Sequence, residues 1–255
     1  MAKAVDLFLN DFSKHKDKAV SADTLGCFCW NVRNPSIKTA IRQVLWLKEQ
    51  PFDILALTET KDSEGCNYVE NYFKARGFHV LFPKPPEDEY GAMVISRFPF
   101  EKGFLFDFGS SRVNSVRSQD FEFVNAYIPN NRESGKKEFL NKLANSLKSA
   151  PKQFVFCGDL NIIEPDHVPH YSKFEAWEYD FYRTVLDMQL HDAFRIINPK
   201  ANEYSWIGRT GDGYRYDHCF VSEDLVSKIH ECYYVHEPRL KRLSDHSGLV
   251  LSIKF

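Results

Sequence analysis

The sequence predicts an α/β protein built as a four-layer sandwich, with two mixed β-sheets packed face to face and helices outside. Two observations support this prediction. At the start of the chain, short runs rich in Val, Ile, Phe and Tyr alternate with helical patterns. In the middle, several such runs follow one another without a helix, which favours antiparallel pairing. Two strand-rich halves, each with covering helices, suit two sheets in face-to-face contact.

The composition is that of an ordinary globular chain with one main domain. The 255 residues are 43% hydrophobic, which is enough to bury a full core. No stretch approaches the roughly 18 to 20 apolar residues that a membrane helix needs, and the polar start lacks a signal-peptide pattern. We therefore expect an intracellular monomer that has no membrane partner.

The net charge and the cysteines argue against two classes of protein, strongly basic nucleic-acid binders and zinc proteins. A formal net charge of -2 argues against a histone-like, strongly basic nucleic-acid binder, although it leaves room for a local basic face. The six cysteines have no zinc-ligand spacing, so we expect reduced and mostly buried thiols.

The N-terminal segment, residues 1–24, is expected to be a helical extension outside the domain formed by residues 25–255. Its second half is charged, and its first half carries apolar residues at the spacing of one helix face: Val5, Phe8, Leu9 and Phe12.

The remaining elements follow from hydrophobic period and length. The first part of the domain predicts strand 25–31, helix 36–49, strand 52–59 and helix 65–76. The middle predicts strands in 78–82, 91–97, 103–108 and 115–130. The last part predicts helix 135–149, strand 153–161, helix 173–189, and strands in 204–208, 214–222, 229–237 and 248–255.

Polar residues recur where the apolar strands end, and a rigid scaffold presents functional groups at such positions. Each of these residues alone suits a turn or a solvated position equally well, but their joint occurrence indicates one convergent site. The residues are Asn31, Glu59, Asn130, Asp159, Asn161 and Asp217, together with Ser244, Asp245 and His246.

Asp217 lies in an otherwise apolar strand, so its carboxylate needs a buried partner, and His246 is the obvious candidate. A group of carboxylates, amides and one imidazole suits the chemistry of a phosphodiester, which is anionic and resists attack. Carboxylate and amide oxygens hold Mg²⁺, and a second carboxylate can deprotonate or orient water.

With these motifs the chain resembles the exonuclease III-like abasic-site endonucleases of the endonuclease/exonuclease/phosphatase superfamily. The resemblance spans residues 25–255 and rests on the strings CWNVRN, LALTETK, NAYIPN, FCGDLNI, YSWIGR, GYRYDHCFVS and SDHSGLVL, which occur in the family's order. It implies the DNase I-like version of the sandwich. It also implies a Mg²⁺-dependent or Mn²⁺-dependent enzyme that cuts duplex DNA 5′ to abasic sites, with 3′-5′ exonuclease or 3′-end-cleaning action in DNA repair.

The resemblance also assigns roles to individual residues. It implies Glu59 as the main metal ligand with Asn31 and Asp245 beside it, and Asp159 as the residue that positions water. It implies a carboxylate and imidazole pair formed by Asp217 and His246. The residues implied to contact phosphate are Asn161, Tyr127, Asn130, Arg132 and Arg215. The pocket for the extruded sugar is implied to consist of Trp206, Tyr214 and Tyr216.

Two departures from the family pattern bear on the substrate. Arg33 stands where the family has a small polar residue, followed by Asn34 in place of glycine, and the segment 162–174 is shorter than usual. Other superfamily substrates therefore stay open, namely those of a tyrosyl-DNA phosphodiesterase, an RNA nuclease or a phosphatase. An inactive DNA-binding relative is the third alternative.

Two further groups have competing interpretations. Asp166, His167 and His170 favour a solvated loop over a second metal site, because no regular spacing fixes their geometry. The basic stretch of Arg239, Lys241 and Arg242 suits a solvated turn and a phosphate-contacting patch about equally.

Overall fold

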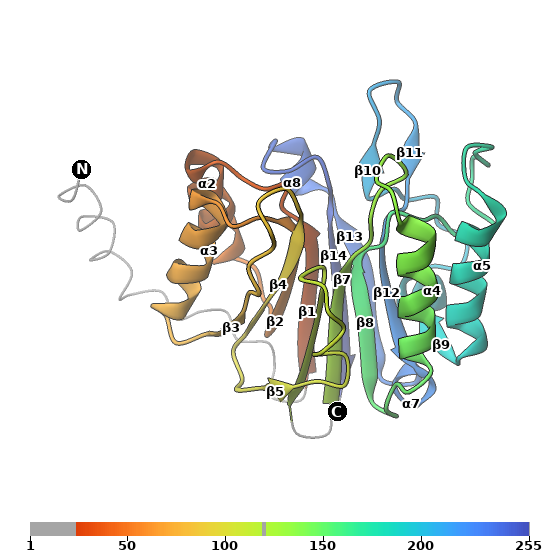
Figure 1. Ribbon diagram of the computed structural model, residues 1–255, viewed down its shortest axis with the longest axis horizontal. Helices are drawn as coiled ribbons and strands as arrows, with labels where there is room; N and C mark the ends of the chain where they lie inside the picture. Colours follow the sequence, from red (N-terminus) through yellow and green to blue (C-terminus); the bar gives the residue numbers. More distant parts are fainter. Residues whose placement is uncertain (1–23, 119–120, 255) are drawn as a thin grey trace.

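The computed structural model describes residues 24–118 and 121–254 and consists of two six-stranded sheets that face each other. In Figure 1, helices α2 (Ile37–Leu47) and α3 (Glu64–Lys74) lie outside one sheet, and α4 (Lys136–Leu147) and α5 (Ala176–Asp187) lie outside the other. The predicted four-layer α/β sandwich is confirmed.

The first sheet has the strand order β13-β14-β1-β2-β4-β3. Only β1 and β2 pair in parallel, and their neighbours pair antiparallel. The strands are β1 (Thr24–Asn31), β2 (Ile54–Thr60), β3 (His79–Leu81), β4 (Gly91–Ser96), β13 (Ile229–Val235) and β14 (Gly248–Lys254).

The second sheet has the order β5-β6-β7-β8-β12-β9, with β7 and β8 in parallel. Its strands are β5 (Glu101–Lys102), β6 (Val113–Ser118), β7 (Phe121–Tyr127), β8 (Phe154–Asp159), β9 (Leu190–Asp192) and β12 (Asp217–Ser222). A separate two-stranded hairpin and three short helices complete the described chain: β10 (Trp206–Ile207) with β11 (Gly213–Tyr214), and α6 (Ala193–Ile197), α7 (Glu223–Val226) and α8 (Glu237–Leu240).

Alternation of side chains along β1 explains how the layers are held together. Cys27 and Cys29 point into the core between the sheets, while Phe28 and Trp30 point into the separate core beneath α2 and α3. Successive residues of a strand face opposite sides, so a strand with helices on one side and a sheet on the other is apolar throughout. All six cysteines are free and buried, as expected.

The four long helices lie within three residues of the bounds that their hydrophobic period predicts, and serine caps begin two of them. The side chain of Ser36 accepts a hydrogen bond from the backbone of Thr39, and that of Ser63 accepts one from Cys66. Such caps satisfy backbone N–H groups that have no partner in the first turn of a helix.

Two sequence predictions are wrong in detail. The predicted strand at 103–108 is a series of turns, in which Phe106 donates to the Gly103 carbonyl and Phe108 donates to that of Leu105. Leu105 and Phe108 pack into the same core cluster, whereas in a strand residues three positions apart would point to opposite faces. The single run predicted at 115–130 is instead a hairpin, because β6 and β7 pair antiparallel.

The predicted N-terminal helix falls on residues 1–23, outside the described residues. Thr24 belongs to β1, where it pairs with Lys254, so the folded domain includes at least one residue more than predicted. Among the described residues, no helix is long and apolar enough to span a lipid bilayer.

Candidate active site

The predicted site residues meet at one end of the sandwich. Asn31 and Glu59 lie at the ends of β1 and β2, which run in parallel in the first sheet. Asp159 ends β8 in the second sheet, and Asp217 begins β12 directly opposite it in register. Parallel strands end at the same edge of a sheet, so these groups converge although 186 residues separate Asn31 from Asp217.

Hydrogen bonds join the two sheets through these side chains. Nδ2 of Asn31 lies 2.8 Å from Oε2 of Glu59 and 2.7 Å from Oδ2 of Asp159. Nδ1 of His246 lies 2.7 Å from Oδ2 of Asp217, which confirms the predicted partner of this buried carboxylate. The other imidazole nitrogen lies 3.9 Å from Oδ2 of Asp159 and is directed into the same cluster.

The backbone around the site adopts conformations that most residues avoid. Glu59 has a φ of 55° and Asn161 a φ of 49°. Such strain costs on the order of 1–3 kcal/mol and persists where the surrounding structure enforces it, commonly at functional sites. Gly158 is required next to Asp159, because a Cβ there would lie 1.8 Å from the Ala126 carbonyl oxygen.

His246 and Asp159 face each other across the cluster, and their surroundings raise the pKa of each for a different reason. Burial lowers the pKa of His246, but the carboxylates of Asp217 and Asp159 outweigh it and raise this pKa to about 10. Burial raises the pKa of Asp159 to about 7, against the opposing effect of His246. At neutral pH the imidazole is therefore protonated on both nitrogens and positively charged, and the Asp159 carboxyl can gain or lose a proton.

The oxygen-bearing side chains fit a divalent cation. Burial raises the pKa of Glu59, so its charge calls for a positive partner. Oδ1 of Asp245 is buried, and no described residue gives it a hydrogen bond. Asn31 contributes an oxygen only if its amide turns over, because Nδ2 faces Glu59 and Asp159.

A second group of possible metal ligands lies beside the first. Ligand atoms of Asp159, Asp217 and His246 lie within 4.8 Å of one another and could also hold a metal ion. The short bond between His246 and Asp217 favours a proton there rather than a metal, because a ligating imidazole nitrogen must be unprotonated. We therefore favour Glu59 and Asp245 as the metal-binding side.

Asn161 and Tyr127 flank Asp159. The backbone N–H of Asn161 donates to Oδ1 of Asp159 at 3.2 Å, and its side chain donates to the Ile128 carbonyl at 3.0 Å. Tyr127 pairs with Asp159 across β7 and β8. Burial raises the pKa of Tyr127, so its phenol stays a hydrogen-bond donor.

An aromatic wall formed by Trp206, Tyr214 and Tyr216 borders the cluster. The rings of Tyr214 and Tyr216 stack with centroids 5.2 Å apart, and the Trp206 ring lies 5.9 Å from that of Tyr216. The Trp206 indole donates to Oδ2 of Asp245 at 3.3 Å, which joins the wall to the proposed metal side. Tyr171, from the short 162–174 segment, stacks on Tyr214 at 4.3 Å and extends the wall.

The residues that were predicted to contact phosphate differ in their exposure and in their partners. Asn130 is held in a turn, with its side-chain amide donating to Glu133 at 2.8 Å, while Arg132 is exposed. Arg239 and Arg242 line a cavity of about 470 Å³ together with Arg33. Lys241 instead pairs with Glu237.

Arg215 requires a correction, because its guanidinium is fully buried and cannot reach a DNA phosphate. Its Nη2 lies 2.7 Å from Oε2 of Glu164 and 2.7 Å from Oδ2 of Asp192. The predicted solvated loop is also wrong at His167, which is buried and accepts a hydrogen bond from the Arg215 backbone at Nε2. Both residues help to hold the 162–174 segment under the aromatic wall.

We expect this ion network to make the folded protein sensitive to acid. Burial raises the pKa of Glu164, but Arg195 and Arg215 outweigh it and lower this pKa to about 2. The resulting stabilisation is complete above the unfolded-state pKa of about 4.3 and is lost as the pH falls towards 2. Urea unfolding at a series of pH values should show this loss, and Glu164→Gln should flatten it. An equal loss in both proteins would contradict the assignment.

Lys136 is a residue of the site that the sequence analysis missed. Its side chain is 4% exposed, and its ammonium donates to the Asn161 carbonyl at 2.7 Å and also to the side chains of Asn131 and Glu178. It therefore ties the segment after Asp159 to α5. No local pattern marks it, because its partner Glu178 is 42 residues away.

Comparison with curated proteins identifies two relatives. The chain is 27% identical over 234 residues to recombination repair protein 1 of Drosophila melanogaster, covering 80% of this chain but only 33% of that protein. It is 23% identical over 232 residues to the exodeoxyribonuclease of Bacillus subtilis (strain 168), covering 79% of this chain and 90% of that enzyme.

Solved structures share the fold at low sequence identity. A variant of the 3′ phosphatase NExo from Neisseria, bound to a product DNA hairpin, matches with a TM-score of 0.78 and 22% identity. An AP endonuclease from Archaeoglobus fulgidus also matches with a TM-score of 0.78, at 24% identity. Each match covers 91% of this chain and all of the other.

The chain also matches a known sequence family. The model of the endonuclease/exonuclease/phosphatase family matches residues 28–246, a range that contains every candidate catalytic residue described above. The resemblance that the motifs predicted is thereby confirmed at the level of the family. The chain belongs to the endonuclease/exonuclease/phosphatase family.

Proposed function

We propose that the protein is a metal-dependent DNA phosphodiesterase that cuts on the 5′ side of abasic sites and also acts on 3′ ends. The observation that carries this proposal is the meeting of Glu59, Asp159 and His246 at one edge of both sheets. Mg²⁺ is the proposed ion, with Mn²⁺ as a substitute. We further propose that the protein acts as a monomer inside the cell.

Each residue of the cluster has a proposed role that its surroundings support. Asp159 accepts the proton of the attacking water, because its pKa of about 7 suits a general base at neutral pH. His246 donates from Nε2 to a phosphate oxygen, because Asp217 keeps the imidazole charged. Asn161 and Tyr127 offer further donors beside Asp159.

Glu59, with Asp245 and Asn31, is proposed to hold the cation. When bound, a hard divalent cation would neutralise negative charge that develops on the phosphate oxygens. The buried Oδ1 of Asp245, which no described residue satisfies, supports this assignment, as does the raised pKa of Glu59.

The aromatic wall supports abasic DNA as the substrate. An extruded sugar without a base is compact and apolar on one face, so it can pack on the rings of Trp206 and Tyr216 beside Asp245. The names of the relatives agree with this class, because they include an exodeoxyribonuclease and an AP endonuclease.

Cleavage mapping on a duplex with one abasic site tests the proposal. We expect a nick on the 5′ side that leaves a 3′-hydroxyl, is abolished by EDTA, and returns on addition of Mg²⁺ or Mn²⁺. An undamaged duplex of the same sequence is the control. Absence of metal-dependent nicking of either duplex would end the nuclease proposal.

Arg33 favours a second candidate function, the removal of a 3′ phosphate. Its Nε lies 3.6 Å from Oδ2 of Asp245, and its side chain is 65% exposed at the cavity shared with Arg239 and Arg242. A terminal phosphate carries more charge than a diester, so these cations suit it. Faster turnover of a 3′-phosphate end than of an abasic duplex would replace the leading proposal, and Arg33→Asn should reduce that preference.

A further inference from the structure

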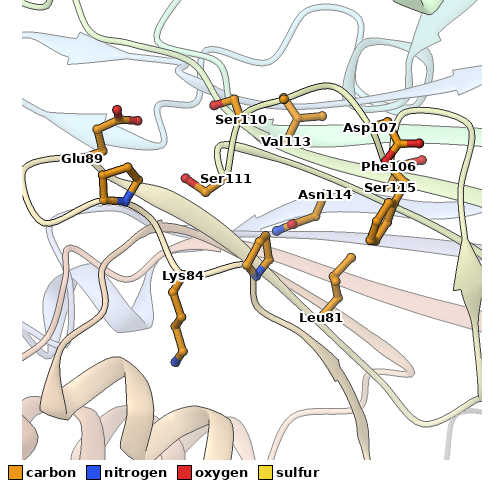
Figure 2. Close-up of a pocket in the computed structure, with 13 residues that line it drawn as sticks. Leu81, Lys84, Glu89, Phe106, Asp107, Ser110, Ser111, Val113, Asn114 and Ser115 are labelled. Atoms are coloured by element: carbon orange, nitrogen blue, oxygen red, sulfur yellow. The ribbon is translucent and has the colours of Figure 1, made fainter.

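A cavity of about 510 Å³ lies outside the candidate active site, at the open edge of the sandwich. One side comes from the end of β3 and the segment between β3 and β4, and the other from the turns before β6 and the first residues of β6. Figure 2 shows these two groups facing each other across the pocket. A volume of this size accommodates a small organic molecule.

The pocket contains polar atoms that nothing else in the described chain satisfies. Both Oδ1 and Nδ2 of Asn114 are buried without a hydrogen-bond partner, and so is Oγ of Ser111. Asn114 is 2% exposed and lines the pocket from β6. A buried amide without partners is destabilising, so a partner of matching shape would be strongly favoured.

The chemistry of the walls narrows the class of ligand. An asparagine amide presents an acceptor and a donor side by side, which matches a ring edge with a donor next to an acceptor. Leu81, Pro83, Pro86 and Phe106 line the pocket with apolar surface against which a flat ring can pack.

The charged residues that line the pocket have no net positive charge, so they do not favour an anion. Lys84 is the only cationic residue among those that line it, and its ammonium lies 2.6 Å from Oε2 of Glu70. In Figure 2 the Lys84 side chain extends away from Ser111 and Asn114. Glu89 and Asp107 are exposed and add negative charge to the lining.

We propose that this pocket binds an uncharged nucleobase, held by Asn114 through adjacent donor and acceptor groups and packed against the apolar walls. The base comes either from an unpaired nucleotide of a DNA strand or from a free nucleoside. The first source is sterically reasonable because two residues next to the pocket lining in the sequence contact the ring of Tyr127. Glu89 precedes Tyr90, whose ring lies 5.8 Å from that of Tyr127, and Ser111 precedes Arg112, whose guanidinium lies 5.1 Å from the same ring.

Titration of the full chain with adenosine tests the proposal by nuclear magnetic resonance. The side-chain amide signal of Asn114, identified by its absence in Asn114→Leu, should shift and saturate. Purine riboside lacks the exocyclic amine and should bind on the order of tenfold more weakly. Adenosine monophosphate should bind more weakly than adenosine, because Glu89 and Asp107 repel its phosphate.

Variants test whether Asn114 itself binds the base. Asn114→Leu should abolish the adenosine response, whereas Asn141→Leu, the same change on the exposed face of α4, should leave it intact. If Asn114→Leu does not fold, Ser111→Ala should still weaken adenosine binding several-fold. Two results would overturn the proposal. One is an Asn114 amide signal that does not shift at millimolar adenosine, and the other is an adenosine response that survives Asn114→Leu.

A second arm distinguishes the sources of the base, and this arm alone rests on the proposed nuclease function. An abasic duplex with an unpaired adenine beside the site should have a lower KM than one with an unpaired purine, and Asn114→Leu should remove the difference. Adenosine binding without this KM difference would assign the pocket to a free nucleoside. If no duplex is nicked at all, the nuclease proposal fails, while the adenosine titration still decides the pocket.

Discussion

Replacement of Asp159 by asparagine should lower kcat for abasic-site cleavage by on the order of 10²- to 10⁴-fold. The amide keeps the shape of the side chain but cannot accept the proton of water. It also removes the negative charge 3.9 Å from Nε2 of His246. Because the loss falls on the chemical step, KM should change much less than kcat.

Single-turnover kinetics on an abasic duplex would measure this loss. Asp187→Asn, at the exposed end of α5, is the matched control and should retain full activity. His246→Ala should show a loss of similar size, because both residues act in the same chemical step. Unchanged activity in both site variants would mean that the activity belongs to a contaminant, and the chain would then be a silent DNA-binding relative.

Replacement of Arg215 by methionine should lower the free energy of unfolding by about 3–5 kcal/mol. The methionine fills much of the same space, but it leaves the carboxylates of Glu164 and Asp192 buried without their shared partner. Removal of one member of a buried ion network costs more than the network contributes, because the remaining charges stay desolvated.

Urea unfolding would measure this effect at neutral pH. Arg183→Met is the matched control, because Arg183 pairs with Asp180 at the surface and 56% of its side chain is exposed. This control should change stability by no more than about 0.5 kcal/mol. A loss for Arg215→Met as small as that of the control would show that the network is not needed for folding. Glu164→Gln combined with Arg215→Met should recover part of the loss.

Much of the fold could be predicted because its signals are local. Helices α2 and α3 begin at serine caps, and the buried strands are continuous apolar runs of four to eight residues. The segment 103–108 was predicted wrongly because alternating Phe104, Phe106 and Phe108 mimic a strand. Its backbone N–H groups are instead satisfied by turns and by the side chains of Ser115 and Glu122.

The candidate site was predictable where its residues end strands, as Asn31 and Asp159 do. Arg215 was assigned wrongly because it stands between two residues of the aromatic wall. In an extended chain neighbouring side chains point to opposite faces, so Arg215 points away from the side shared by Tyr214 and Tyr216. Lys136 could not be found, because only the folded chain brings it to Glu178.

The cluster draws its side chains from both sheets, and this has a consequence for folding. Asn31 belongs to the first sheet and Asp159 to the second, and the bond between them exists only when the sheets have docked. Neither sheet alone can therefore carry the complete centre. Catalysis should disappear in the same denaturant transition as the tertiary fluorescence signal, so that turnover itself reports the cooperativity with which the two sheets assemble.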